Sequence, residues 1–153
     1  QATVARHVDD TLAEMQLRDA PVFITPTPLN TLLWRIVVLT EDGYLEGFDS
    51  LLLDDDEISF AAHETDRAAL IEASDVWAVA RLRWFSGDFL KAEVDADELI
   101  LSDLRMGQEP FYVFAHVAAT RGNPHWKEIP TELLPFSFEN RALAGTWTRI
   151  WSR

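Results

Sequence analysis

Apolar residues recur at helical spacing near the start of the chain, with Asp9, Asp10 and Glu14 at positions off their stripe. Apolar residues that are three or four positions apart lie on one face of an α-helix. The pattern therefore predicts an amphipathic helix over residues 3–17 that begins near a Thr cap. Its apolar stripe consists of Val4, Val8, Leu12 and Met15.

Two apolar, β-branched runs follow, separated by an acid–glycine turn. The first run, residues 32–40, reads LLWRIVVLT, and the second occupies residues 44–53. Such a pair around Asp-Gly is typical of a β-hairpin, so we predict a turn at Asp42-Gly43. Three prolines in the preceding segment DAPVFITPTPLN predict an extended entry strand and loop. A short third strand is expected around residues 58–62.

The pattern returns to helical over residues 66–85, which are rich in Ala and Leu and contain neither Gly nor Pro. We predict a short helix and then a second one that Ser74-Asp75 caps, ended by Gly87-Asp88. The residues available for the buried face are Leu70, Trp77, Val79 and Leu82.

Three more strands are expected at residues 89–94, 98–103 and 111–120, joined by the turns DAD and RMGQEP. The turn-rich segment RGNPHWKEIP follows, and the end of the chain predicts a short helix that packs Leu143, Trp147, Ile150 and Trp151. The expected fold is α+β: an antiparallel sheet of about five to seven strands with an amino-terminal helix and a central helical segment packed on it. With 153 residues, 48% of them hydrophobic, residues 1–153 are expected to form a single soluble domain.

Charge and composition exclude several classes of function. The net charge of −13 argues against nucleic-acid binding and against an anionic bilayer, since both need clustered Lys and Arg. The absence of Cys excludes disulfides, thiol chemistry and Cys-ligated zinc. The longest apolar runs fall short of the roughly 20 residues of a membrane-spanning helix. Because the chain starts without Met or a signal segment, we interpret it as part of a longer protein.

Candidate metal ligands are few. His63, Glu64 and Asp66 form the densest group of ligand-type residues, and His116 lies in a predicted strand. A solvated turn is the more common role for the first three, and a hydrogen-bonded core or edge histidine for the fourth. The sequence contains no HExxH, GxSxG, SxxK or glycine-rich phosphate loop.

Several charges stand inside otherwise apolar segments. A buried Asp is costly unless it is paired, so we expect Asp103 to form an ion pair with one of the arginines. Gly107 is expected to adopt a positive φ in the following turn. The arginines in these segments are Arg35, Arg81, Arg83 and Arg105.

Three motifs give a resemblance to a known family: PTPLNTLLWRIVVLTEDGYLEGFDSLL, RLRWFSGDFLKAE and DLRMGQEPFYVFAHV. In this order and spacing they resemble the carboxy-terminal soluble region of the YdjM-like family of membrane-bound, metal-dependent hydrolases of the bacterial inner membrane. The resemblance implies that the metal-binding His and Asp residues, and a divalent metal such as zinc, belong to a membrane-embedded amino-terminal half. No catalytic residue is carried over to this chain.

The first function hypothesis is therefore a soluble accessory domain, not catalytic by itself, whose partner is its own membrane-embedded amino-terminal half. The second is a ligand- or peptide-binding module with an aromatic and arginine-lined pocket. A third makes this chain itself catalytic, with His63, Glu64 and Asp66 or His116 completing a metal site. The sequence leaves the substrate, the side of the membrane and the oligomeric state open. The residues expected in a binding pocket are Trp34, Arg35, Trp84, Asp103, Arg105 and Tyr112.

Overall fold

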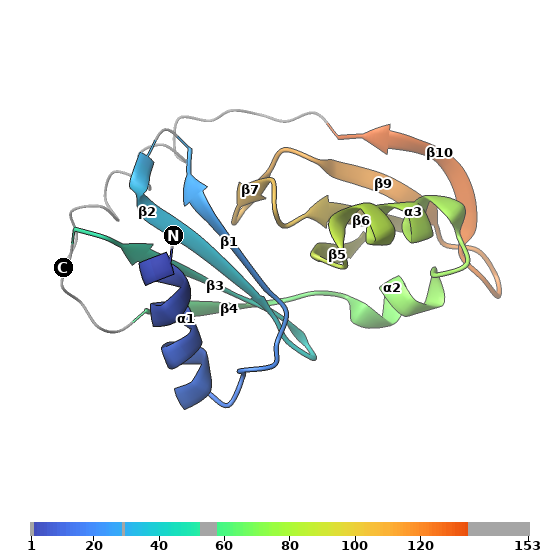
Figure 1. Cartoon of the computed structure of the whole chain (residues 1–153). Helices are drawn as coiled ribbons and strands as arrows, with labels where there is room; N and C mark the ends of the chain where they lie inside the picture. Colours follow the sequence, from blue (N-terminus) through green and yellow to red (C-terminus); the bar gives the residue numbers. More distant parts are fainter. Residues whose placement is uncertain (1, 29, 53–57, 135–153) are drawn as a thin grey trace. The chain divides into compact units, whose positions relative to one another are not determined.

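The computed structural model describes residues 2–28, 30–52 and 58–134 (Figure 1). The described residues divide after His63 into two compact units. The first unit contains the amino-terminal residues up to His63, and the second contains the described residues from Glu64 onward. The single domain over residues 1–153 stays a prediction.

The first unit consists of one helix and a four-stranded antiparallel sheet in the order β1-β2-β3-β4. Helix α1 lies along the sheet, and its stripe of Val4, Val8 and Leu12 packs against Ile36 and Val38. Its elements are α1 (Ala2–Glu14), β1 (Val22–Thr27), β2 (Asn30–Leu39), β3 (Gly43–Ser50) and β4 (Phe60–Glu64).

Local chemistry accounts for the ends of these elements. Helix α1 ends at Glu14, and Gln16 has a φ of 60°, so Met15 lies beyond the buried stripe and is exposed, contrary to the prediction. The hairpin of β2 and β3 is confirmed, but its turn is one residue earlier than predicted. Thr40 and Gly43 close the turn because the Thr40 N–H donates to the Gly43 carbonyl at 2.9 Å.

The second unit contains two helices, a sheet in the order β10-β9-β6-β5 and a two-stranded ribbon of β7 and β8. Its core joins Leu90, Ala92, Leu99 and Leu101 of the sheet to Ala73 and Val79 of the helical segment. Its elements are α2 (Arg67–Glu72), α3 (Trp77–Ser86), β5 (Leu90–Asp95), β6 (Glu98–Asp103), β7 (Gly107–Gln108), β8 (Phe111–Tyr112), β9 (Ala115–Thr120) and β10 (Lys127–Leu133).

Helix capping in the second unit differs from the expectation. Asp66 caps α2, because its Oδ1 accepts the Ala69 N–H at 2.9 Å. Ser74-Asp75 does not cap α3: the N-cap is Val76, which makes no side-chain cap hydrogen bond. Gly87 ends α3 with a φ of 63°, as predicted, since glycine tolerates the left-handed conformation.

The α+β class, the antiparallel pairing and the amino-terminal helix are confirmed. The strands are more numerous than expected: the described residues form ten strands in sheets of four, four and two rather than one sheet. The expected strand over 111–120 is divided into β8 and β9, and β10 occupies part of a segment that we interpreted as turns. The predicted final helix, with Leu143, Trp147, Ile150 and Trp151, lies outside the described residues. Among the described helices, none has both the length and the apolar character that crossing a membrane requires.

Candidate functional site

Helix α3 turns its largest apolar side chains toward solvent. Trp77, Trp84 and Phe85 are 65%, 72% and 62% exposed. They lie on one face of the helix because they are separated by seven and eight residues, close to two turns. Ala80 and Arg81 occupy the turn between them and are exposed as well. We call the five residues Trp77, Ala80, Arg81, Trp84 and Phe85 the aromatic stripe.

The opposite face of α3 explains this orientation. Ala78, Val79 and Ser86 are buried, and Leu82 packs against the core of the second unit. Small residues on the inner face let a helix approach a sheet closely, so the fold itself leaves no space for the tryptophans. The predicted burial of Trp77 is therefore wrong, whereas that of Leu70 and Val79 is confirmed.

Two arginines lie against the aromatic rings of the stripe: Arg81, which belongs to the stripe, and Arg105, which follows β6. The Cζ atom of Arg81 is 4.8 Å from the centre of the Trp84 ring, and that of Arg105 is 5.1 Å from the centre of the Phe85 ring. Both distances are within the range of cation–π contacts. The stripe thus combines large apolar rings with positive charge, and α3 contains no acidic residue.

Arg105 is fixed by Asp103, which forms the predicted ion pair. The Nε and Nη2 atoms of Arg105 donate to the two carboxylate oxygens of Asp103 at 3.0 Å and 2.7 Å. These hydrogen bonds, in spite of the opposing effect of burial, raise the pKa of Arg105. Asp103 pairs with Leu90 in the sheet, and directly paired residues share a face, so the ion pair is on the side that α3 covers.

The glycine after this ion pair permits the tight ribbon of β7 and β8. Gly107 has a φ of 136°, as expected, and a Cβ at this position would collide with the Phe111 carbonyl oxygen and lie 2.8 Å from the Cα of Tyr112. In the segment DLRMG, the ion pair of Asp103 and Arg105 therefore lies at the end of β6, and Gly107 begins the ribbon of β7 and β8.

The six residues expected to line a pocket fall in both units. Asp103 and Arg105 form an ion pair, and Arg105 lies over the Phe85 ring. Trp84 instead contacts Arg81, and Tyr112 is buried in the second unit. In the first unit, the Trp34 indole N–H donates to the Thr31 carbonyl at 2.9 Å, and Arg35 is buried. The structure therefore brings Asp103 and Arg105 of the predicted set into direct contact, with Asp103 buried in the second unit.

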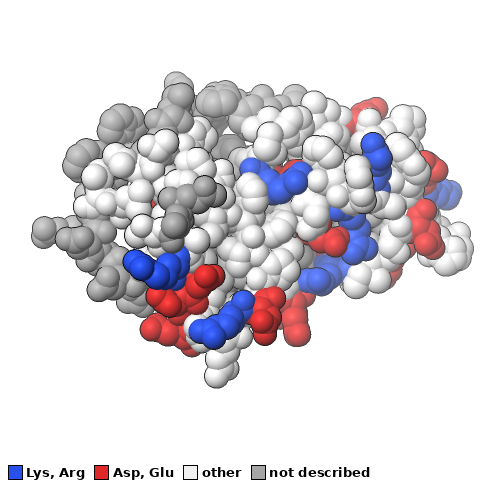
Figure 2. All heavy atoms as spheres, in the orientation of Figure 1, with Lys and Arg blue, Asp and Glu red and all other residues white. Residues whose placement is uncertain are grey.

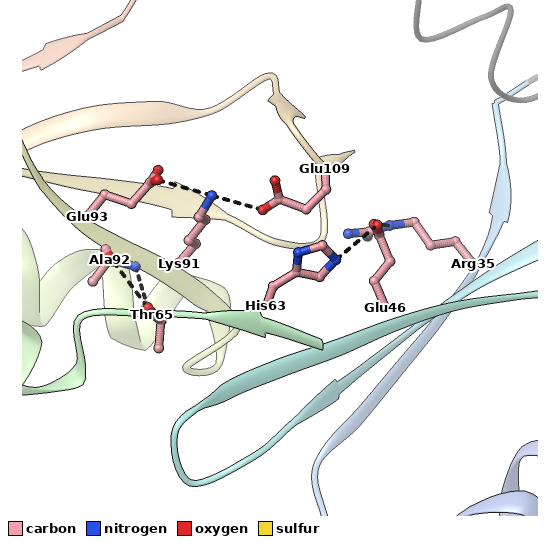
Figure 3. A network of polar contacts seen from close by, with 8 residues as sticks. All are labelled: Arg35, Glu46, His63, Thr65, Lys91, Ala92, Glu93 and Glu109. Carbon is pink, nitrogen blue, oxygen red and sulfur yellow. Dashed lines mark hydrogen bonds and ion pairs between the residues drawn. The ribbon is translucent and has the colours of Figure 1, made fainter. Parts of the chain in front are cut away.

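Arg35 contributes to a buried polar network on the face of the first sheet that does not face α1. Its Nε donates to Glu46 Oε1 at 2.7 Å, and both side chains are almost completely buried. His63 Nε2 lies 3.9 Å from Glu46 Oε2 (Figure 3). The His63 ring also stacks on Tyr44. The hydrophobic pattern alone does not indicate Glu46 as the partner of Arg35.

Lys91 pairs with two acids in the second unit, and the hydrophobic pattern does not indicate these ion pairs either. Its ammonium group is 3.1 Å from Glu93 and 3.0 Å from Glu109 (Figure 3). Burial lowers the pKa of Lys91, but the hydrogen bonds to Glu109 and Glu93 outweigh it, and the net shift is upward. On the edge of β5, the Ala92 N–H donates to the Thr65 hydroxyl at 2.6 Å, so the segment before α2 covers this edge.

The candidate metal ligands have separate surroundings. Glu64 is exposed, Asp66 caps α2, and His63 adjoins Glu46. His116 lies half-buried on β9, and this burial lowers its pKa. Within the described ranges, no three His, Asp or Glu side chains form a group suited to a metal ion.

The described surface is mixed in charge. Figure 2 shows acidic and basic side chains side by side on the visible face, with clusters of acids along the lower edge. No family model, curated protein or solved structure matches the chain. The resemblance to membrane-bound hydrolases therefore stays a prediction from the motifs.

Proposed function

We propose that this chain is the accessory domain of a membrane-bound, metal-dependent hydrolase of the bacterial inner membrane, and that it acts by docking at the membrane-embedded half of the same polypeptide. In this proposal the divalent metal, such as zinc, and the reaction belong to that half. The three motifs that resemble the family support the proposal, and the exposed aromatic stripe of α3 supplies an apolar surface that can hold the chain at the membrane beside that half.

The aromatic stripe is the observation that carries this proposal. Its three rings present on the order of 400 Å² of apolar surface, since an aromatic side chain can bury about 150–250 Å². That is comparable to the largest apolar patch of a typical monomer, about 300–600 Å², and such patches are often functional. Because the core of the second unit is built from other residues, the rings are available for a partner.

Elemental analysis of the purified, extensively dialysed chain tests the accessory role. We expect no stoichiometric zinc or manganese, and no hydrolysis of chromogenic esters or phosphoesters when these metals are added. One equivalent of bound metal together with turnover that is lost in Asp103→Ala would place the chemistry in this chain and overturn the proposal. A matched His125→Gln variant, changed at an exposed loop histidine, controls for adventitious metal on surface imidazoles.

The contact of Arg105 with Phe85 favours a second candidate function, a module that binds a small ligand or peptide. An exposed ring next to a guanidinium suits a planar, anionic group. Phenyl phosphate is a suitable probe. This function predicts saturable chemical-shift changes around α3 that disappear in Phe85→Ala and persist in Leu133→Ala, which changes an exposed residue of β10. Shifts spread over the whole surface would count against it.

A further inference from the structure

The chemistry of the aromatic stripe identifies what it contacts. We propose that the stripe is an interfacial lipid contact, in which Trp77, Trp84 and Phe85 enter the boundary between headgroups and acyl chains and Arg81 binds a lipid phosphate. This inference rests on the proposed function, because it specifies how a docking domain is held beside its membrane-embedded half.

The arrangement of ring and guanidinium fits a headgroup layer. Tryptophan has an apolar ring and a polar N–H, which is why it is enriched at membrane interfaces. Arg81 lies over the Trp84 ring with its Cζ 4.8 Å from the ring centre, so one helical turn presents an apolar surface and a phosphate-binding group together. No ion pair involving Arg81 is found among the described residues, whereas Arg83 binds Asp88 at 2.7 Å.

The size of the stripe favours lipid over a folded protein partner. A stable protein–protein interface buries about 800 Å² on each partner, roughly twice the area of the three rings. Helix α3 has ten residues, and such a helix is only about 15 Å long, so it offers little additional contact area. A bilayer requires no matching patch, since the strength of interfacial binding increases with the apolar area and charge that are present.

The negative net charge of the chain favours a zwitterionic over an anionic bilayer surface. The net charge is −13, yet α3 contains Arg81 and Arg83 without an acidic residue. An anionic bilayer would repel the chain as a whole, whereas a zwitterionic bilayer presents phosphate groups to Arg81 without net repulsion. Binding should therefore be stronger to phosphatidylcholine than to phosphatidylglycerol vesicles at low salt, and the difference should shrink as salt screens the repulsion.

Co-flotation of the full chain with phosphatidylcholine vesicles tests the inference. We expect the triple variant Trp77→Ser, Trp84→Ser, Phe85→Ser to lose at least about tenfold in vesicle partitioning, because it removes the apolar surface that would be buried. Arg81→Gln should lose less. Ile71→Ser and Leu133→Ser change exposed apolar residues outside the stripe and should partition like the unchanged chain. Circular dichroism and the thermal midpoint show that each variant is folded.

Any of three vesicle results would overturn the inference: no flotation of the unchanged chain, equal flotation of the triple variant, or binding that increases with the phosphatidylglycerol content. Self-association without lipid that the triple variant abolishes would assign the stripe to a second copy of the chain instead. These outcomes are separate from the test of the accessory role. A chain that holds no metal and does not float would keep the accessory role and lose only the lipid contact.

Discussion

Arg105 binds the carboxylate of Asp103 through two parallel hydrogen bonds, with Nε at 3.0 Å from Oδ1 and Nη2 at 2.7 Å from Oδ2. The backbone N–H of Arg105 adds a third hydrogen bond to Oδ1 at 2.9 Å. Asp103 is only 4% exposed, so these three donors replace the water that its carboxylate loses on folding. The two partners differ in exposure, and this difference has consequences for mutation.

The loss of Arg105 should reduce the free energy of unfolding more than the loss of Asp103. Arg105→Ala leaves a buried carboxylate with fewer donors, and we expect a loss of about 3 kcal/mol or more in the free energy of unfolding. Asp103→Ala leaves an arginine that can reach water, and we expect a loss of about 1–3 kcal/mol. Urea unfolding followed by circular dichroism measures both, with the exposed Arg81→Ala as a control. Equal, small losses would contradict this role for the pair.

Two glycines provide a matched test of backbone geometry. Gly107→Ala brings a Cβ to 2.8 Å from the Cα of Tyr112, at a φ of 136°, and we expect a loss of about 3 kcal/mol or more. Gly87→Ala meets no atom within 4 Å and carries only the cost of the left-handed conformation, about 1–2 kcal/mol. Thermal unfolding compares the two. If both variants lose equally, backbone strain and not the collision determines the cost.

The sequence predicts where α3 lies better than which way it faces. Helical composition and the Gly87 stop correctly locate the helix. Its orientation depends on the sheet below, which accepts Ala78 and Val79 and excludes the larger Trp77. Helix α3 has small apolar residues on one face and large aromatic residues on the other, so the periodicity alone does not decide which face is buried. The exposure of the aromatic stripe can therefore be predicted only from the structure of the sheet on which α3 packs.

The buried network of the first unit could have been partly predicted. A hairpin closed by Thr40 and Gly43 pairs Val37 with Glu46, and this register puts Arg35 and Glu46 diagonally on one face. The burial of this face could not be predicted, because charged residues such as Arg35 and Glu46 are usually exposed. The partners of Lys91 were harder to predict, since Glu109 comes from the turn between β7 and β8 and not from a neighbouring strand.

Arg35 and Glu46 allow the effect of burial to be separated from that of distance. Their Nε–Oε1 distance of 2.7 Å equals the Arg83–Asp88 distance, but the latter pair is exposed. Glu46→Ala should cost about 3–5 kcal/mol because it leaves a buried guanidinium, whereas Arg83→Ala should cost about 1 kcal/mol or less.

A double substitution completes this test. The variant Arg35→Met, Glu46→Leu should recover most of the stability lost in Glu46→Ala, since apolar side chains of similar volume can replace a buried ion pair. Urea unfolding of the double variant and of the matched single variants Arg35→Met and Glu46→Leu gives the coupling energy. A double variant that is as unstable as Glu46→Ala would show that the network holds the sheet through specific hydrogen bonds.

His116 should make the chain less stable in mild acid. Burial lowers the pKa of His116 in the folded chain, so the unfolded chain binds this proton more readily. The stability that depends on neutral His116 is fully present above the unfolded pKa of about 6.5, and it is lost as the pH falls through the lower folded value.

His116→Gln removes this titration. Its thermal midpoint should therefore fall less than that of the unchanged chain between about pH 7.5 and pH 5, the range around an unperturbed histidine pKa. His125→Gln, at an exposed loop position, should keep the full pH dependence and controls for the loss of a histidine as such. If His116→Gln and the unchanged chain lose stability in parallel, the acid sensitivity comes from other groups, and the half-buried imidazole of β9 contributes nothing to it.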